Sequence, residues 1–283
     1  MKQYHDLLQD ILDNGVETEN RTGVGTLSVF GRQMRFNLEE GFPAVTTKKL
    51  AWKGVVGELL WMLEGSTDER RLAEITFDKD RTELVDRRTI WTDNANYQGK
   101  ALGYQNTDFY KELGPVYGEQ MRNFSGIDQI EHILNLIKNE PNSRRIVMSL
   151  WNPKDLPHMA LEPCHVLTQF RVYNGKLNCM MTMRSNDVGL GLPFNIAFYS
   201  LMTHLFAKEC GLGVGEYIHT TGDAHIYLDH VDGIKEQLNR EPFGLPSLYI
   251  DDRFDLMDRL KNGMQPGDVN LFRLDNYNHH PAI

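Results

Sequence analysis

The sequence predicts a single α+β domain that spans residues 1–283. Three observations predict this class. Segments with apolar residues at helical spacing are interleaved with segments in which apolar and polar residues alternate, as they do in strands. Two strand-like segments are joined by Asn174-Gly175, the dipeptide of a tight hairpin. No repeat, low-complexity tract or Ser/Pro-rich linker divides the chain.

The expected elements follow from these patterns in chain order. Helices are expected at residues 4–12, 52–63, 127–137, 194–210 and 226–240, and strands at residues 26–36, 146–151, 166–173, 177–183 and 217–220. Gly15 and Gly65 are expected to end the first two helices, because glycine is common just past a helix C-terminus. Residues 66–112 are the least regular stretch, and we interpret them as an insertion with some helix.

Composition limits the classes of function. The chain has 39 acidic and 30 basic residues, a formal net charge of -9, which argues against a general nucleic-acid binder. Its three cysteines show no CxxC spacing, which suits a reducing compartment. No apolar run approaches the ~18 residues of a membrane span, and the N-terminus lacks the apolar stretch of a signal peptide. We therefore expect a cytoplasmic protein with no membrane or nucleic-acid partner.

Cys164 is the strongest candidate for a nucleophile. A cysteine is most often a small buried apolar residue, and Cys179 and Cys210, on apolar segments, keep that interpretation. Cys164 differs because a proline precedes it, a histidine follows it, and Arg184 lies on the next strand of the predicted hairpin. A nearby cation lowers the pKa of a thiol and so raises the fraction of reactive thiolate.

Four arginines are candidates for binding a phosphate, because the guanidinium group matches the geometry of phosphate oxygens. They are Arg21 in a glycine-containing loop, Arg144 and Arg145 beside an apolar strand, and Arg184. For Arg144 and Arg145 the alternative is ordinary surface charge. Motifs of the GxxxxGK[ST] and GxGxxG kinds are absent, which argues against ATP and NAD chemistry.

Other polar residues suggest recognition of a base and a sugar. Asn195 stands at the expected start of a helix, where it is either an N-cap or an amide that matches the O4 and N3 edge of uracil; an Asp would suit cytosine better. His225 and Tyr227 share a face if their segment is extended, and so suit two hydrogen bonds to a sugar. Glu58 lies within an apolar helix, where a carboxyl group is costly to bury without a partner. No HxxxH, HxH or CxxC spacing occurs, so no metal is expected.

These residues lie in longer motifs that together resemble the folate-dependent thymidylate synthase family. The motifs are FPAVTTKK (42–49), ELLW (58–61), GPVYG (114–118), SRR (143–145), PCH (163–165), RSxD (184–187) and DAHIY (223–227). The likeness runs from Arg21 nearly to the C-terminus, interrupted at 66–112 and near 250–272. It implies an α/β sandwich with mixed sheets, one of them at a dimer interface. It also implies a homodimer in which Arg144 and Arg145 reach the phosphate site of the other subunit.

The resemblance also implies a reaction. Cys164 adds to C6 of dUMP, which makes C5 enolate-like, and C5 takes the one-carbon unit of the co-substrate 5,10-methylenetetrahydrofolate. The folate then delivers a hydride, which gives dTMP and dihydrofolate. Asn195 holds the uracil edge, and His225 and Tyr227 hold the ribose 3′-hydroxyl. The substrate-binding candidates are Arg21, Arg144, Arg145, Arg184, Ser185, Asn186, Asp187, Asn195, His225 and Tyr227.

Further roles follow from the same resemblance. Glu58 organises water and proton transfer, and Tyr117 assists removal of the C5 proton. Together with Cys164, Arg184 and Asn195, these two residues make up the expected catalytic set. Asp187 bonds the pterin ring of the folate, Trp91 lines its pocket, and Ala51 stands where some members have a polar folate contact.

Departures from the family pattern keep an alternative open. Met183 precedes Arg184 where family members usually carry Gln. The resulting sequence MRSNDV (183–188) resembles that of phage deoxycytidylate hydroxymethylases. Those relatives, however, carry Asp at the position of Asn195. Thr92 stands where Asp is usual. In one alignment of the last residues, family members continue beyond the position of Ile283 with about six residues that close over the site. In the other alignment, residues 281–283 are themselves a shortened form of that closing segment.

The alternative is a dUMP hydroxymethylase, which yields 5-hydroxymethyl-dUMP and leaves tetrahydrofolate unoxidised. It shares every nucleotide contact with thymidylate synthesis, so only the fate of the exocyclic methylene separates the two. A third interpretation is a regulator that binds nucleotide or RNA. The presence of Cys164, Glu58 and Asn195 and the acidic charge oppose that interpretation.

Overall fold

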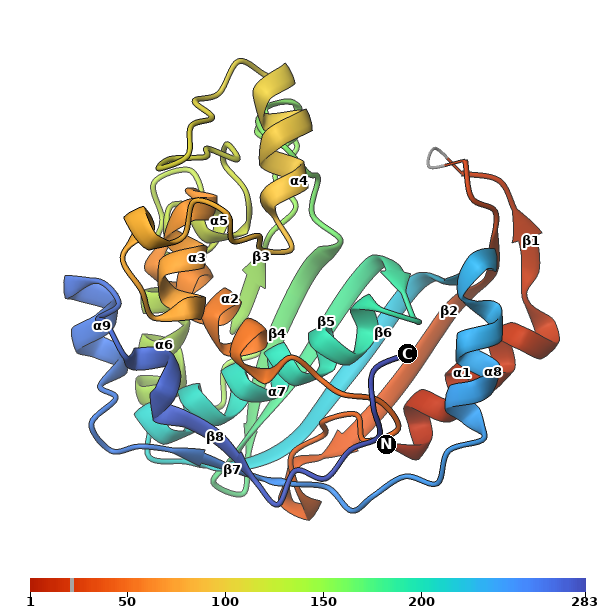
Figure 1. The fold of residues 1–283 in the computed structure, drawn as a ribbon. Coiled ribbons are helices and arrows are strands. Elements are labelled where there is room, and N and C mark those ends of the chain that lie inside the picture. The colour runs from red at the N-terminus through yellow and green to blue at the C-terminus, as the bar shows by residue number, and fades with distance from the viewer. Residues whose placement is uncertain (21–22) are drawn as a thin grey trace. The chain divides into compact units, whose positions relative to one another are not determined.

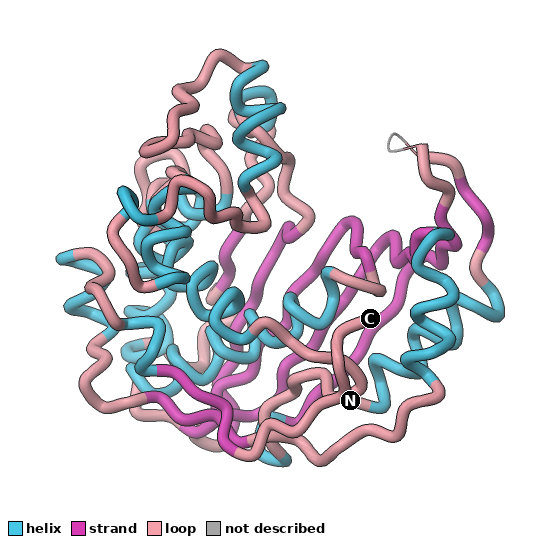
Figure 2. Tube along the Cα trace, viewed as in Figure 1, coloured by secondary structure: helices cyan, strands magenta, loops and turns pink. Residues whose placement is uncertain are grey.

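The computed structural model describes residues 1–20 and 23–283, which divide into two compact units. The first comprises Met1–Ala51, Cys164–Tyr249 and Leu274–Ile283; the second comprises Trp52–Pro163 and Ile250–Arg273. Figures 1 and 2 show both helices and strands distributed along the chain, so the predicted mixed class is confirmed. The phosphate candidate Arg21 lies outside the described residues.

A mixed sheet forms the frame of the first unit. Its strands lie in the order β1 (Val16–Thr18), β2 (Thr26–Asn37), β6 (Gly213–Tyr227), β5 (Lys176–Asp187) and β4 (His165–Tyr173) (Figure 1). β5 and β6 pair in parallel, whereas the β1–β2, β2–β6 and β4–β5 pairs are antiparallel. Helix α7 (Gly191–Glu209) packs against β5 and β6, and α1 (Lys2–Asn14) packs against β2 and α8 (Val231–Leu238).

The strands of this sheet arise from local sequence signals. In β5, Leu177, Cys179, Met181 and Met183 are buried and alternate with more accessible residues, as expected for a strand covered by a helix on one face. Asn174 and Gly175 have φ angles of 50° and 72°, the left-handed conformation that a two-residue hairpin loop requires. The predicted hairpin between β4 and β5 is therefore confirmed.

The second unit is mainly helical. It contains α2 (Trp52–Glu64), α3 (Glu69–Phe77), α4 (Thr92–Asn94), α5 (Tyr117–Arg122), α6 (Gln129–Asn139), α9 (Leu256–Asn262) and the short strand β3 (Val147–Ser149). Helix α2 packs against α3 and α5. A Cβ atom at Gly57 would lie 3.0 Å from Thr76 Cα, so glycine permits the close approach of α2 and α3. Residues 66–112 contain helices α3 and α4, in agreement with the expectation of some helix in this stretch.

Several short elements complete the chain. Strands β7 (Ser247–Ile250) and β8 (Phe272–Asp275) form a separate two-stranded sheet. The short 3-10 or π segments are η1 (Leu38–Glu40), η2 (Arg81–Glu83), η3 (Ala95–Gly99), η4 (Leu156–His158), η5 (Leu228–His230) and η6 (Asp268–Leu271). Over the described part of the chain, no helix combines the length and apolar character that a membrane crossing needs.

Four sequence predictions need correction. The helix expected at 226–240 was wrong at its start, because Ile226 and Tyr227 pair with β2 at the end of β6 and α8 begins only at Val231. This strand pairing outweighs the local helical pattern. Asn195 does not cap a helix: α7 begins at Gly191, so Asn195 already lies inside it. The strand expected at 146–151 is shorter than predicted, and the strand expected at 217–220 is much longer.

Candidate active site

Cys164 and Arg184 are neighbours at the end of the β4–β5 hairpin in the first unit. His165 pairs with Met183 across the hairpin, and the next pair is joined by a hydrogen bond of 2.9 Å from the Arg184 backbone N–H to the Cys164 carbonyl oxygen. Cys164 is half-buried and Arg184 is exposed. The structure thus places a guanidinium-bearing residue beside the thiol-bearing one, as the hairpin prediction required.

The adjoining ends of β5 and β6 carry further site candidates. Ser185 pairs with Asp223, and Asp187 pairs with His225. His225 Nδ1 lies 2.7 Å from Asp223 Oδ1, a contact that lowers the pKa of the Asp223 carboxyl group. The rings of His225 and Tyr227 are 5.3 Å apart and nearly perpendicular. The two side chains therefore share one face of the extended strand, as their spacing predicted.

Asn186 does not fit a role in substrate contact. Its side chain is buried, with 1% of its surface exposed. The amide Nδ2 donates to His219 Nε2 at 2.7 Å and to Met183 Sδ at 3.2 Å. Because successive residues of a strand point to opposite faces, Asn186 turns into the core while Asp187 does not. We therefore withdraw Asn186 from the substrate-binding set.

Asn195 is held by His165, a residue for which the sequence indicated no role of its own. His165 Nε2 lies 3.2 Å from Asn195 Oδ1, and His165 Nδ1 lies 3.0 Å from the Tyr199 hydroxyl. Burial lowers the pKa of His165 to about 4, so the ring is neutral at neutral pH and donates from one nitrogen only. In the tautomer that fits both contacts, Nδ1 accepts from the Tyr199 hydroxyl group and the Nε2–H group donates to Asn195 Oδ1. This hydrogen bond fixes the direction of the Asn195 amide. Adjacency to Cys164 was the available sequence signal.

A pocket of about 180 Å³ lies near Asp187 in the same unit. Its lining includes Lys48, Leu190 and His230. Burial lowers the pKa of Lys48 to about 8, and the Asp187 carboxylate opposes that shift. Asp187 Oδ1 accepts a hydrogen bond of 3.0 Å from the Leu190 N–H. Lys48 belongs to the FPAVTTKK motif, but its sequence context indicated no role for it; the fold brings its cation near the Asp187 carboxylate.

Glu58 has the partner that its burial demanded. In the second unit, Trp91 Nε1 donates to Glu58 Oε1 at 2.8 Å. Burial raises the pKa of Glu58 to about 7, and the Trp91 hydrogen bond opposes this rise. The buried rings of Trp91 and Tyr117 lie 5.8 Å apart, nearly edge to face. A carboxyl group with a pKa near neutrality is suited to proton transfer.

The remaining candidates are placed as follows. Arg144 and Arg145 are exposed in the second unit, just before β3, and the Arg145 N–H donates to Ser143 Oγ at 3.2 Å. Ala51 is exposed at the end of its segment of the first unit. Burial raises the pKa of Cys179 to about 12, which makes it a poor nucleophile.

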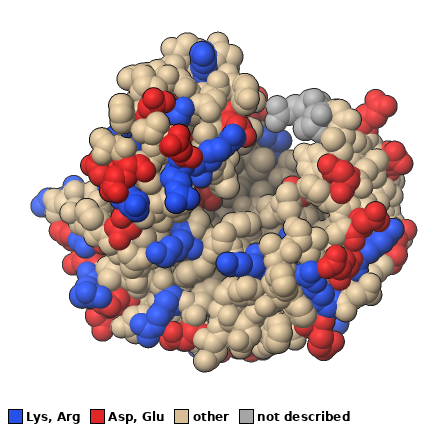
Figure 3. Space-filling model, in the orientation of Figure 1, with Lys and Arg blue, Asp and Glu red and all other residues tan. Residues whose placement is uncertain are grey.

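The distribution of surface charge and of possible metal ligands says less about function than the residues described above. On the face drawn in Figure 3, basic side chains are interspersed with acidic ones, which is not the pattern of a nucleic-acid interface. Within residues 1–20 and 23–283, no three His, Cys, Asp or Glu side chains are grouped to hold a metal ion.

Comparison with known proteins decides the family. A family model described as Thymidylate synthase matches residues 2–283. The chain belongs to the thymidylate synthase family. It is 47% identical to the thymidylate synthase of Enterobacteria phage T4, over 100% of this chain and 98% of that protein. It is 43% identical to the thymidylate synthase of Listeria monocytogenes serotype 4b (strain CLIP80459), with the same two coverages. It is also 45% identical to the bifunctional dihydrofolate reductase-thymidylate synthase of Paramecium tetraurelia, over 99% of this chain and 60% of that protein.

These matches confirm the family and the fold that the sequence predicted. The activity of a thymidylate synthase is methylation of dUMP with methylenetetrahydrofolate as co-substrate, so the main functional prediction is confirmed as well. Hydroxymethylation is not favoured, because the matched relatives are named as thymidylate synthases.

Proposed function

We propose that this member of the thymidylate synthase family uses Cys164 as its nucleophile. The observation that carries the proposal is the pairing of Cys164 with Arg184 at the end of the hairpin. The thiolate Sγ forms a bond to C6 of dUMP, and the electron pair of the C5–C6 double bond moves onto C5 and O4. C5 then bonds to the methylene carbon of the folate. Arg184 favours the thiolate through its charge and binds the phosphate.

We propose that Asn195 reads the uracil ring. His165 donates to Asn195 Oδ1, so the amide NH₂ is directed toward O4 of the base while Oδ1 keeps a second lone pair for the N3 proton. His225, steadied by Asp223, and Tyr227 bind the ribose 3′-hydroxyl from the face of β6 that they share. Ser185 and Arg21 complete the phosphate contacts; Arg21 lies outside the described residues.

Proton transfer and the folate involve a separate set of residues. We propose that Glu58 exchanges a proton with water near neutral pH, which its raised pKa permits, and that Tyr117 assists loss of the C5 proton. Asp187 bonds the pterin ring, Trp91 lines the folate pocket, and Ala51 offers the folate no polar contact. Loss of the C5 proton breaks the bond between the methylene carbon and N5 of the folate, which leaves an exocyclic methylene on C5 and releases tetrahydrofolate. Hydride passes from tetrahydrofolate to this methylene, which gives dihydrofolate, and the Cys164 thiolate leaves C6 as the C5–C6 double bond re-forms in dTMP.

The product of the reaction tests this assignment. We expect incubation with dUMP and methylenetetrahydrofolate to add one CH₂ to the nucleotide and to form one dihydrofolate per dTMP. Mass spectrometry of the nucleotide and absorbance of dihydrofolate measure the two quantities on one sample. A gain of CH₂O with tetrahydrofolate left unoxidised would instead establish a hydroxymethylase, and Met183 would become the first residue to examine.

We also propose that the chain acts as a homodimer in which Arg144 and Arg145 bind the phosphate of the other subunit's nucleotide. Both side chains are exposed, so a nucleotide bound to another subunit can reach them. A Cys164→Ser chain and an Arg144→Ala/Arg145→Ala chain should each be inactive alone. Co-expressed with different tags, their purified hybrid has one complete site and should recover about half of the wild-type activity per dimer. A monomer in sedimentation, or an inactive hybrid, would contradict the proposal.

We also propose that the chain forms a single domain and that the protein is located in the cytoplasm. The family match spans both compact units, which supports one domain over residues 1–283 with an insertion at 66–112. A single cooperative unfolding transition in calorimetry would support this domain assignment, and two independent transitions would oppose it. The cytoplasmic location is tested by fractionating the cells that make the protein.

A further inference from the structure

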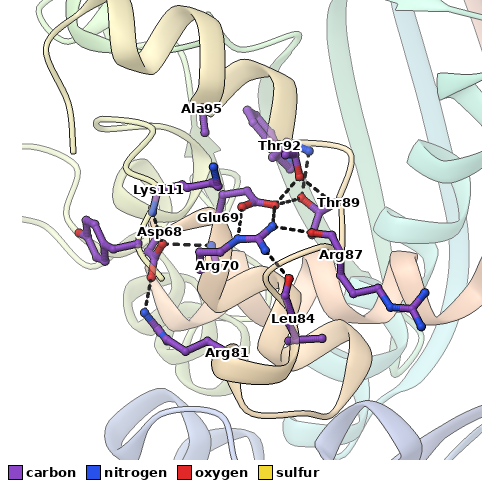
Figure 4. A network of polar contacts seen from close by, with 12 residues as sticks. Asp68, Glu69, Arg70, Arg81, Leu84, Arg87, Thr89, Thr92, Ala95 and Lys111 are labelled. Carbon is purple, nitrogen blue, oxygen red and sulfur yellow. Dashed lines mark hydrogen bonds and ion pairs between the residues drawn. The ribbon is translucent and has the colours of Figure 1, made fainter. Parts of the chain in front are cut away.

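A buried ion pair joins adjacent residues at the start of α3 in the second unit (Figure 4). Arg70 Nε donates to Glu69 Oε2 at 2.7 Å, and the Arg70 NH2 group donates to Glu69 Oε1 at 2.7 Å. The side chains are 1% and 0% exposed. Arg70 also donates to the carbonyl oxygens of Leu84, at 2.8 Å, and Arg87, at 2.9 Å. The guanidinium group is thus tied to the start of the helix and to two points of the following loop.

The Glu69 carboxylate has a second set of partners. Glu69 Oε1 accepts hydrogen bonds of 2.6 Å from the hydroxyl groups of Thr89 and Thr92. The same hydroxyl groups accept from the backbone: the Thr89 N–H donates to Thr92 Oγ1 at 2.8 Å, and the Trp91 N–H donates to Thr89 Oγ1 at 3.2 Å. Two hydroxyl groups held by one carboxylate therefore fix the backbone N–H groups of Thr89 and Trp91.

This arrangement leads directly to Glu58, because Trp91 Nε1 donates to its carboxylate at 2.8 Å. We propose that Glu69 and Arg70 are positioning residues for catalysis, which hold residues 89–92 so that the Trp91 indole N–H stays on Glu58. The proposal rests on the role proposed above for Glu58. It assigns to these residues a function in setting the proton affinity of Glu58, without contact with either substrate.

Energetics favour a positioning role over a purely stabilising one. Removing two charges from water has a large cost, and a buried ion pair is often no more stable than an apolar pair of the same volume. A fully hydrogen-bonded polar network instead confines its members to one geometry. Here the network joins Arg70, Glu69, Thr89 and Thr92 and extends through Thr89 to the backbone N–H of Trp91. The indole N–H of Trp91 in turn donates to Glu58.

The direction of the effect follows from the groups around each carboxyl. At Glu58, burial favours the protonated form and the Trp91 hydrogen bond favours the ionised form. Tyr117 on α5 is a further titratable side chain against the Trp91 ring. At Glu69, burial raises the pKa, but the hydrogen bonds from Arg70, Thr89 and Thr92 and the charge of Arg70 outweigh it, so the pKa of this carboxyl group lies below its usual value. Lys111 is a further cation near Glu69. If Trp91 moves away, Glu58 loses the contact that stabilises its carboxylate, so its pKa rises.

The test compares two substitutions at one position. Thr92→Val removes the hydroxyl group but keeps the shape and leaves the ion pair in place, whereas Thr92→Ser keeps the hydroxyl group. We expect the limb of the kcat–pH profile that belongs to Glu58 to move upward by about one pH unit in Thr92→Val, the effect of losing one hydrogen bond to a charged group. Thr92→Ser should restore the wild-type limb. Glu69→Gln, measured in the same way, provides a second variant.

Asp268→Asn is the matched control for stability. Asp268 is buried and forms a two-point ion pair with Arg259 at 2.8 and 3.1 Å in the same unit, without a hydrogen bond to residues 89–92. This variant should lose stability and keep its pH limb. Suppose that the limb of the kcat–pH profile disappears in Glu58→Gln but stays at its wild-type pH in folded Thr92→Val and Glu69→Gln. That result overturns this inference and leaves the role of Glu58 intact. A limb that persists in Glu58→Gln overturns the role of Glu58 and this inference with it.

Discussion

Cys164→Ser is expected to lower kcat for dTMP formation by on the order of 10⁴-fold or more, since a serine hydroxyl is a far weaker nucleophile than a thiolate. The substitution changes one atom at a half-buried position, and the backbone hydrogen bond from Arg184 does not involve the side chain. We therefore expect the variant to fold and to bind dUMP. The loss should fall on kcat, while nucleotide affinity stays close to wild type.

The covalent intermediate provides a direct measurement. With 5-fluoro-dUMP and methylenetetrahydrofolate, the wild-type protein should form an adduct that intact-protein mass spectrometry detects after denaturation. Cys164→Ser should form none. Cys210→Ser is the matched control, because Cys210 is also half-buried but lies at the C-terminal end of α7. An adduct that survives in Cys164→Ser would show that another residue attacks the base.

Glu58→Gln is expected to lower kcat by roughly 10²- to 10³-fold, the usual contribution of a positioned acid–base group. The amide keeps the shape of the side chain and its oxygen still accepts from Trp91, but it cannot exchange a proton. The limb of the kcat–pH profile near pH 7, where Glu58 titrates, should therefore disappear. A kcat within a few-fold of wild type, with the limb intact, would remove Glu58 from the mechanism.

The same variant should also change stability in a pH-dependent way. The pKa of Glu58 is about 7 in the folded protein, against an ordinary value of 4.5, so the folded state binds the proton more tightly between these limits. Stability therefore falls as pH rises from 4.5 through 7. Glu58→Gln lacks this loss, and above pH 7 it should be more stable than wild type by on the order of 1 kcal/mol or more. Thermal unfolding below pH 4.5 should show no difference between the two proteins.

Several features could be predicted from sequence because their causes are local. The dipeptide Asn174-Gly175 adopts the left-handed angles that its residue types favour, so the β4–β5 hairpin followed from composition. That hairpin in turn brought Arg184 beside Cys164. The alternation of His225 and Tyr227 predicted a shared face, and their rings are in contact. Glu58 was notable because a carboxyl group in an apolar helix needs a partner.

Other features depend on contacts between distant segments. The helical pattern at 226–240 failed at its start because Ile226 is bonded into a sheet by Leu27, almost 200 positions earlier in the chain, and no local pattern contains that partner. Asn186 stands in a motif beside site residues, yet a strand turns alternate side chains to opposite faces and directs it to His219.

The local signals of the chain were sufficient for its family, its reaction and the identity of Cys164 as the expected nucleophile, because these rest on residue types in a fixed order. The surroundings of those residues were not encoded locally. The direction of the Asn195 amide depends on His165. The pKa of Glu58 depends on burial, which raises it, and on the Trp91 hydrogen bond, which lowers it. Hydrogen bonds and desolvation act through space over a few ångströms, so they exist only once the folded chain has brought these side chains together.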